Sequence, residues 1–587
     1  MLKRFWGYFS NYKRPLIISC ICVILESIFE LVIPLLMADI IDVGVPARDT
    51  SYILIRGAEM VVCALIALAL GAAYAHFGSI AGMGFGAELR RAEYKKVQEY
   101  SFSNIDHFST SSLVTRLTND VTVLQNAICN GIRPVVRGPF MMVAAFIMTV
   151  ILNPKLSLIF LAAIPILGLF LYFILRKLGP MYGQMQKALD KVNRTIQENL
   201  IAIRVVKSFV TEDYERGKFA EVNSRFRKTS EGAFHYAALN MPCFQLVMYS
   251  TIICILWFGG NMVISSSMQV GELTGFLSYV LQILNSLMMI SNVFMMLTRS
   301  VTSCERILEV LDEPIDIKDA SVSCDPDGTA KDLQPGLEVS RGDITFENVW
   351  FKYDKDAPEY VLSDISLNLG AGQTMGILGA TGSAKTSLVQ LIPRLYEATK
   401  GHVLIDGHDV KEYSLVHLRD AIGVVLQKNT LFSGSIRENL LWGNSSASDE
   451  ELMWACRIAC ADEFISRLPQ GLDTVLDQGG VNVSGGQKQR LCIARALLKK
   501  PRVLIFDDST SAVDTATESR IRHALAHDLP HTTKIIISQR ISSVQHADQI
   551  LIMDNGHINE TGTHQQLLDH NEIYQNMYWS QKKGAKA

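Results

Sequence analysis

The sequence predicts a multidomain protein in which an all-α membrane bundle precedes an α/β domain. The chain has 587 residues, 49% of them hydrophobic, and a mean hydropathy of +0.19. Long apolar stretches fill the first half, whereas short β-branched strands, turns and helices alternate in the second. Because single cores seldom exceed about 300 residues, we place a membrane domain at 1–312, a linker rich in Asp, Pro, Gly and Ser at 313–341, and a second domain at 342–587.

Six stretches are long and apolar enough to span a bilayer. The first has 22 residues, 16–37, which at about 1.5 Å per residue covers roughly 33 Å, and a hydrocarbon layer is ~30 Å thick. A soluble helical bundle is the alternative, but these helices lack a full polar face. The predicted spans are 15–41, 58–80, 132–152, 156–178, 241–263 and 273–297.

Basic residues predict the orientation of the spans. They cluster before the first span, after the second and after the fourth, whereas the loops on the other side hold only Arg48 and Lys155. Because Lys and Arg are enriched in cytoplasmic loops, we expect a multi-pass protein of a bacterial inner or plasma membrane, surrounded by lipid, with both termini and the second domain in the cytosol. The net charge of −3 gives no sign of nucleic-acid binding.

The two long connections between spans look helical. Residues 81–131 and 179–240 contain few helix breakers, and structureless connections of such length are rare. We therefore expect each to form a helical hairpin that carries the bundle into the cytosol and returns, with turns near 104–112 and 210–214. Such tips are well placed to touch a cytosolic domain.

A glycine-rich loop predicts a phosphate site in the second domain. The strand 373–378 runs into GATGSAKTS at 379–387, and a helix follows. In this context, backbone N–H groups and the helix N-terminus surround phosphates, the lysine reaches the β- and γ-phosphates, and the following hydroxyl holds Mg²⁺. The expected ligands of ATP and Mg²⁺ are Gly379, Thr381, Gly382, Ser383, Ala384, Lys385, Thr386 and Ser387.

Two further motifs complete the pattern. The strand VLIFD at 503–507 ends in Asp507, which would bind Mg²⁺ through water, and VSGGQKQR stands upstream at 483–490. The latter resembles the LSGGQ signature of ABC ATPases. Together with the loop at 379–387 (Walker A) and the strand at 503–507 (Walker B) at this spacing, it identifies the chain as a member of that family. By this resemblance, the signature residues Ser484, Gly485, Gly486 and Gln487 bind nucleotide held by a second chain.

The resemblance covers essentially the whole chain and implies the exporter branch. It implies that Tyr353 stacks on adenine, that Gln427 contacts Mg²⁺ and senses the membrane helices, and that residues 511–514 form the D-loop. In that branch the hairpin tips are coupling helices, here near 108–111 and 211–214. The implied activity is ATP hydrolysis that drives alternating access. An importer is disfavoured because importers usually keep the two domains on separate chains, and a soluble ABC ATPase would lack the spans.

Three positions depart from the family pattern. Ala384 replaces a glycine where the loop curls closest to the phosphates, and alanine tolerates fewer backbone angles. Asp508 replaces the catalytic Glu that activates water, and a side chain about 1 Å too short can cost ~10²-fold in rate. Gln539 replaces the switch His and cannot carry a positive charge. A weaker departure is Gln478, where the exporter X-loop has an acidic residue.

By the resemblance, each ATP lies between the Walker motifs of one chain and the signature of the other. The three substitutions would all fall in one of these two ATP sites. The signature, which serves the other site, is intact. The pattern favours a heterodimer with a second half-exporter chain over a homodimer, with this chain carrying the slow or inactive site. Harmless drift is the alternative explanation.

The sequence gives less information about the transported compound. Glu26 and Glu30, one turn apart in the first span, could attract cationic drugs or pair with polar groups between helices. Export of small hydrophobic or amphipathic compounds, as in multidrug exporters, is the leading prediction. Lipid or peptide export, or an ATP-gated membrane sensor, are the alternatives.

Overall fold

The chain forms two compact units in the computed structural model, which describes residues 2–319, 337–354, 356–508 and 513–584. One unit contains residues 1–98 and 110–313, and the other contains residues 99–109 and 314–587. Residues 99–109 lie in the region assigned above to the membrane domain, yet they pack with the second unit. Residues 320–336 of the predicted linker lie outside the described part of the chain.

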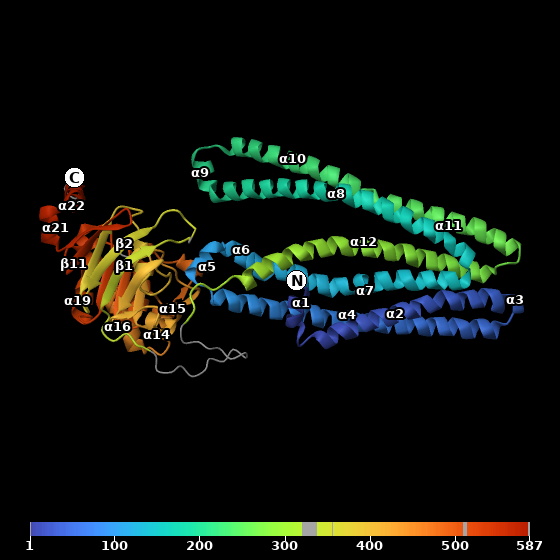
Figure 1. Cartoon of the computed structure of the whole chain (residues 1–587), viewed down its shortest axis with the longest axis horizontal. Coiled ribbons are helices and arrows are strands. Elements are labelled where there is room, and N and C mark those ends of the chain that lie inside the picture. Colours follow the sequence, from blue (N-terminus) through green and yellow to red (C-terminus); the bar gives the residue numbers. More distant parts are fainter. Residues whose placement is uncertain (1, 320–336, 355, 509–512, 585–587) are drawn as a thin grey trace. The chain divides into compact units, whose positions relative to one another are not determined.

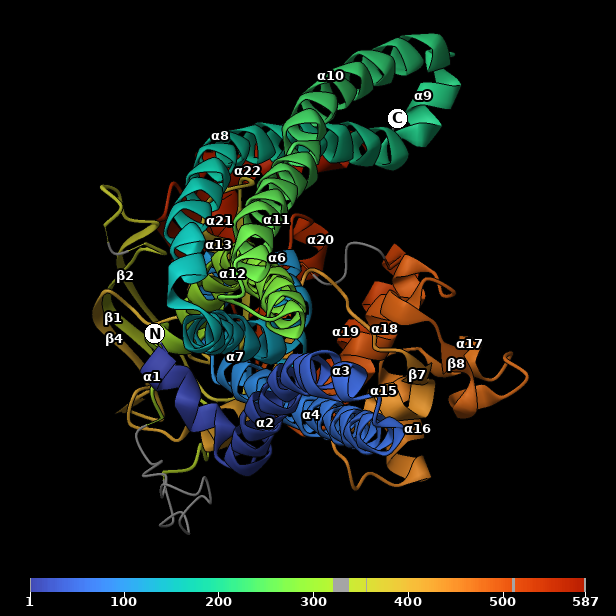
Figure 2. The same ribbon diagram turned by 90° about the vertical axis from the view of Figure 1, so that its right-hand side faces the viewer.

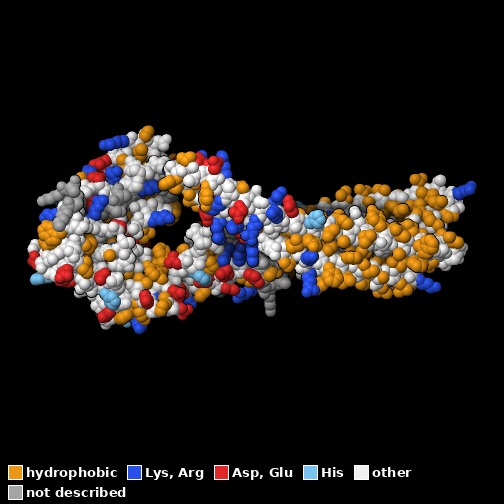
Figure 3. Space-filling model, turned by 90° about the horizontal axis from the view of Figure 1, so that it is seen from above, with side chains coloured by type: hydrophobic (Ala, Val, Ile, Leu, Met, Phe, Trp, Pro, Cys, Tyr) orange, Lys and Arg blue, Asp and Glu red, His pale blue; other side chains and the backbone are white. Residues whose placement is uncertain are grey.

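Within the described residues, the first unit contains six helical segments long and apolar enough to cross a membrane, which confirms the predicted six-span bundle. They are Lys13–Ala47, Thr50–Gln98, Thr110–Leu152, Pro154–Ile201, Glu212–Ile264 and Val270–Ile290. Hydrophobic side chains cover a long stretch of this unit's surface, at the right of Figure 3. The longest of these segments has 53 residues, more than twice the ~20 that a bilayer needs, as the long connections between spans predict.

The elements of this unit are labelled in Figure 1. α2 packs along α4, α7 along α12, and α8 along α10 and α11 (Figures 1 and 2). They are α1 (Leu2–Phe5), η1 (Trp6–Phe9), α2 (Lys13–Asp39), η2 (Ile40–Gly44), α3 (Val45–Ala47), α4 (Thr50–Gln98), α6 (Thr110–Thr115), η3 (Arg116–Asp120), α7 (Val121–Leu152), α8 (Pro154–Ile201), α9 (Ile203–Ser208), α10 (Glu212–Ala238), α11 (Asn240–Ile264) and α12 (Val270–Asp312).

The turn between α7 and α8 shows how local chemistry ends one span and begins the next. Asn153 is extended, and its side-chain oxygen accepts hydrogen bonds from the backbone N–H groups of Lys155 and Leu156, both at 3.1 Å. Pro154 occupies the first position of α8, where its missing N–H costs nothing. A three-residue sequence therefore caps the new helix without a longer loop.

The two intramembrane carboxylates are paired between helices. Glu26 of α2 accepts hydrogen bonds from Arg133 at 2.5 Å and from Arg137 at 3.2 Å, both on α7. Arg137 also pairs with Glu30, and the ring of Tyr74 on α4 lies 6.0 Å from the Arg133 guanidinium. Of the two readings left open above, pairing between helices is the one that the contacts support, since each carboxylate has a cationic partner.

We expect Arg137→Leu to destabilise the bundle by about 3–5 kcal/mol, because it leaves Glu30 unpaired and removes one of two cations from Glu26. Thermal unfolding of the purified chain in lipid measures the loss. The control is Arg216→Leu, which breaks an exposed pair with Asp213 and should cost less than about 1 kcal/mol. Equal losses in both variants would contradict a structural role for the buried pair.

The second unit is an α/β domain, as predicted, with strands in three sheets. The orders are β2-β1-β4-β5, β12-β11-β3-β10-β9-β6 and β7-β8. The strands are β1 (Ile344–Phe351), β2 (Leu362–Leu369), β3 (Thr374–Gly379), β4 (Lys400–Ile405), β5 (His408–Asp409), β6 (Ile422–Val425), β7 (Gly434–Ser435), β8 (Val475–Leu476), β9 (Val503–Asp507), β10 (Thr533–Ile537), β11 (Gln549–Asp554) and β12 (His557–Gly562).

Helices cover these sheets. They are α5 (Phe102–His107), α13 (Lys385–Gln390), α14 (Leu415–Asp420), α15 (Ile436–Leu441), α16 (Asp449–Ile458), α17 (Asp462–Ile465), α18 (Gly485–Leu497), α19 (Thr515–Asp528), α20 (Ile541–Val544), α21 (His564–His570) and α22 (Glu572–Gly584), with the short turns η4 (Gly471–Asp473) and η5 (Gln478–Gly480).

The parallel centre of the six-stranded sheet positions the site. β10 pairs in parallel with β3 on one side and with β9 on the other, so that Ile537 lies opposite both Ile377 and Asp507. All five residues of β9 and of β10 are buried, as is typical of strands covered on both faces. The carboxyl ends of these three strands therefore meet at one edge, where ligands bind in open α/β sheets.

Candidate nucleotide-binding site

The loop after β3 surrounds the ammonium group of Lys385. Its Nζ donates to the carbonyl oxygens of Gly379 and Ala380, at 2.9 and 2.7 Å, and to the hydroxyl of Ser383 at 3.1 Å. Burial lowers the pKa of Lys385, and the carboxylates of Asp508 and Asp507 oppose that shift. A cation held inside a loop at a helix N-terminus is the arrangement that a polyphosphate requires.

Ala384 occupies a backbone conformation that favours glycine. Its φ is +69° and its ψ is 21°, and it immediately precedes α13 as the N-cap. An L-residue in this left-handed region costs roughly 1–2 kcal/mol, a cost that glycine avoids. Thr381 and Gly382 are exposed nearer the start of the loop. An alanine at this position therefore strains the loop.

Thr386 and Asp507 meet where a metal ion would bind. The Thr386 hydroxyl donates to Oδ1 of Asp507 at 2.8 Å, and burial raises the pKa of Asp507. A hydroxyl and a carboxylate oxygen are ligands that Mg²⁺ accepts, so these residues fit the ion. Gln427 lies two residues beyond β6, the strand next to β9, with its side chain exposed.

Asp508 and Gln539, the two residues predicted at the catalytic positions, touch each other. Nε2 of Gln539, which follows β10 by two residues, donates to Oδ2 of Asp508 at 3.4 Å. Asp508 follows β9, with its backbone N–H bonded to the carbonyl of Ile537 at 3.1 Å. Burial raises the pKa of Asp508, whereas Lys385 and Arg540 oppose the shift. Both side chains line a pocket of about 820 Å³.

Tyr353, predicted to stack on adenine, lies beside the phosphate loop. Its hydroxyl is 2.7 Å from the hydroxyl of Ser387 on α13, and its ring is partly exposed. Its ring makes edge-on contacts with Phe351 and Tyr396, with centroids 4.8 and 5.1 Å apart. A flat aromatic surface is thus held next to the loop, where an adenine ring can stack.

A contact that the sequence did not reveal links Tyr353 to α5. The hydroxyl of Tyr396 donates to Oδ2 of Asp106 on α5 at 2.5 Å, and its ring meets Phe102 edge-on at 6.0 Å. Tyr396 follows the P-loop helix in an ordinary apolar run, and Asp106 lies hundreds of residues earlier. No spacing rule joins such residues; only the folded chain does.

A short helix, α5, immediately precedes the segment 108–111, whose coupling role stays a prediction. Helix α5 ends at His107, and residues 108 and 109 are not helical. The reason is the capping of α5. The N–H of Asn104 bonds to the Ser101 hydroxyl at 3.2 Å, and the Asn104 side chain returns to the Ser101 N–H at 3.2 Å. This reciprocal pair starts a helix at Phe102.

The signature residues form the N-terminus of helix α18. Ser484 caps α18, and its N–H bonds to the side chain of Gln487 at 2.8 Å. Ser484 and Gly485 are exposed and Gly486 is partly exposed, which leaves the N-terminus of α18 accessible to a phosphate. Of the predicted D-loop, residues 511 and 512 lie outside the described part of the chain. Asp514 caps α19 by accepting from the Thr517 N–H at 2.9 Å.

The structure therefore brings the loop 379–387, Asp507, Asp508 and Gln539 to one sheet edge, with Tyr353 beside the loop. The signature residues lie elsewhere in this unit, at the start of helix α18.

Relief of the strained loop should improve nucleotide binding. We expect Ala384→Gly to tighten ATP binding by up to about fivefold, because roughly 1 kcal/mol of backbone strain is removed. Titration with a fluorescent ATP analogue measures the affinity. The matched control is Ala380→Gly, in the same loop but outside the left-handed region; an equal gain there, or none at 384, would argue against strain.

Loss of the Tyr396 hydroxyl should loosen α5. We expect Tyr396→Phe to speed amide hydrogen exchange in residues 99–109 by roughly tenfold or more, since a hydrogen bond to a carboxylate contributes about 1.5–3 kcal/mol. The control is Tyr413→Phe, which removes a hydroxyl bonded to the Ile405 carbonyl in the same unit. Unchanged exchange in 99–109 would show that the ring contacts alone hold α5.

Comparison with known proteins agrees with this architecture. Residues 16–287 match the family described as the ABC transporter transmembrane region, and residues 362–511 match the family described as ABC transporter. The chain is 39% identical to the ABC transporter ATP-binding protein YfiB of Bacillus subtilis, over 99% of this chain and 98% of that protein. It is 31% identical to YgaD of the same organism, over 98% and 99%, a protein named for multidrug export.

Among solved structures, a bacterial Atm1-family ABC exporter with ATP bound has the same fold. The TM-score is 0.81 at 23% identity, covering 97% of this chain and 100% of that one. With a membrane-spanning bundle and an ATPase domain on one polypeptide, the chain belongs to the ABC transporter family and has the fold of an ABC exporter half-transporter.

Proposed function

We propose that the protein is one subunit of a heterodimeric exporter that uses ATP to move hydrophobic or amphipathic compounds, including drugs, out of the cell. In this proposal its own ATP site is degenerate, and its signature completes the working site of a partner chain. The observation that carries the proposal is the contact between Asp508 and Gln539 at the sheet edge. At this edge the chain has Asp508 where the family has the longer Glu, and the neutral amide of Gln539 where the family has His.

The mechanism follows from the geometry of this edge. Lys385 and the loop would bind the phosphates, and Thr386 and Asp507 would hold Mg²⁺, which neutralises phosphate charge. Asp508 is one methylene shorter than Glu, so its carboxylate would orient an attacking water less closely. Gln539 donates a hydrogen bond but supplies no positive charge to the γ-phosphate. Such a site binds ATP and hydrolyses it slowly, and thereby acts as a clamp.

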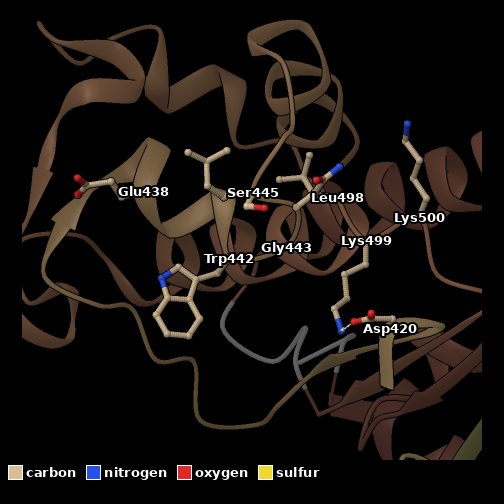
Figure 4. A pocket seen from close by; sticks show the side chains of 10 residues that line it. Asp420, Glu438, Trp442, Gly443, Ser445, Leu498, Lys499 and Lys500 are labelled. Atoms are coloured by element: carbon tan, nitrogen blue, oxygen red, sulfur yellow. Dashed lines mark ion pairs between the residues drawn. The ribbon is translucent and has the colours of Figure 1, made fainter. Parts of the chain in front are cut away.

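Two exposed apolar surfaces are evidence for the proposed second chain. At the end of the α8–α10 hairpin, Phe209 and Val210 are 73% and 81% exposed, although this tip is predicted to face the cytosol. The second unit carries a groove of about 870 Å³ (Figure 4). There Trp442 is 66% exposed and stacks on Phe432, with ring centroids 4.3 Å apart. We propose that the groove receives the hairpin tip of the partner, because both surfaces expose apolar side chains.

The cargo assignment rests on two observations. Glu26 and Glu30 are neutralised by Arg133 and Arg137, which removes the argument for attraction of cations. The similarity to YgaD, which is named for multidrug export, favours apolar or amphipathic drugs over lipids or peptides.

Restoration of the catalytic pair tests the degenerate site. We expect Asp508→Glu with Gln539→His to raise ATP hydrolysis at this site by up to ~10²-fold, because the carboxylate regains its reach and the histidine supplies charge. The measurement is ATP turnover by the purified dimer, together with drug flux into inside-out vesicles. Asp569→Glu, on exposed helix α21, is the control. If the double variant turns over ATP no faster than the control, the site is not limited by these residues.

A further inference from the structure

A buried carboxyl group lies among helices outside the nucleotide site. Glu93 of α4 is 0% exposed, and among the described residues neither of its carboxylate oxygens has a hydrogen-bond partner. One turn earlier on the same helix face, Leu89 packs in an apolar cluster with Phe85 and Ile307. An ionised carboxylate left unpaired in such surroundings costs several kcal/mol, and such groups usually bind a proton instead.

A second buried acid adds to this cost. Asp120, the last residue of η3, is 2% exposed, and its charge disfavours ionisation of Glu93. Oδ1 of Asp120 accepts hydrogen bonds from the Ser303 hydroxyl at 2.9 Å and from Arg306 at 2.5 Å. Its Oδ2 is buried and has no partner among the described residues. Because α4 packs against η3, two buried acids lie at one junction of helices, and three of their carboxylate oxygens have no hydrogen-bond partner among the described residues.

The arginines near Glu93 form hydrogen bonds and ion pairs with other residues. Arg116 of η3 donates to the carbonyl of Arg306 at 2.9 Å and pairs with Glu309 at 2.7 Å, both on α12. Arg90 of α4 donates to Thr122 and Gln125 at 3.3 and 3.1 Å. Both arginines attract Glu93 at longer range, and Tyr8 of η1 also faces it. These cations partly offset the burial of Glu93 but donate no hydrogen bond to it.

We propose that Glu93 and Asp120 form a proton-binding site at the junction of α4, η3 and α12, with Glu93 carrying the proton while the helices are packed. When two carboxylates share one site, one of them retains its proton well above the usual pH. Arg306 and Ser303 donate hydrogen bonds to Asp120, whereas Glu93 has no donor among the described residues, so Glu93 is the acid that takes the proton. The segment η3 is a π-helix, a feature frequent at functional sites.

Proton binding at this site makes the packed junction sensitive to pH. In the packed junction, Glu93 has a higher proton affinity than a hydrated carboxyl group. The packed junction therefore binds more protons than the opened junction does. Packing is therefore favoured at low pH and loses stability as pH rises through the value at which Glu93 ionises. Because α4, α7 and α12 are membrane-spanning helices, opening of the junction during transport would release the proton and closing would take it up.

Infrared spectroscopy of the full-length chain in lipid nanodiscs tests protonation directly. We expect the protein at about pH 7, well above the ordinary Glu pKa of ~4.3, to show a carbonyl band of a protonated carboxyl group that is lost in Glu93→Gln. The control Glu309→Gln removes an exposed acid of the same junction and should leave the band intact. A spectrum of Glu93→Gln identical to that of the unchanged protein would overturn the proposal.

Thermal unfolding between about pH 5 and pH 9 provides a second readout. We expect the Tm of the unchanged protein to fall toward high pH relative to Glu93→Gln, which mimics the protonated form, and relative to Glu93→Leu, which fills the site with an apolar group. Parallel pH profiles for all three proteins would show that Glu93 does not titrate and would reject the site. Should one variant fail to fold, the other still gives the comparison.

Discussion

The parallel pairing of β10 between β3 and β9 is the constraint on which the nucleotide site depends. It places Gly379, Asp507 and the residues after Ile537 at one edge of the sheet. The hydrogen bond from Thr386 to Asp507 then ties the phosphate loop to β9. If this register slipped by one residue, side chains would exchange faces, and Asp507 would separate from Thr386 of the loop.

The same edge shows why the departures from the family pattern belong together. Ala384 strains the loop, and Asp508 and Gln539 bond to each other beside it. Under the proposed function, each change affects a different step: loop closure, water orientation or charge stabilisation. We propose that a site altered in this way keeps the groups that bind ATP and lacks those that hydrolyse it quickly. The exposed start of α18 is a separate feature, and its capping by Ser484 and Gln487 is complete.

Local patterns predicted most of the architecture because the physical causes are local. Length and apolarity alone indicated six spans, and the structure has six such helices. The strand 503–507 ends at Asp507, as the run of apolar residues indicated. The start of α5 at Phe102 was not indicated by hydropathy, because the Ser101–Asn104 cap that begins this helix depends on side-chain hydrogen bonds.

By itself, the sequence determined the two-part organisation, the number of spans and the identity of the phosphate loop, since each follows from periodicity or from a contiguous motif. Only the tertiary structure decided how distant side chains pair. It joined Glu26 and Glu30 to Arg133 and Arg137, and Tyr396 to Asp106. It also buried Glu93 beside Asp120. The physical reason is that charge pairing and desolvation depend on distances set by helix packing, and these are not encoded in residue spacing.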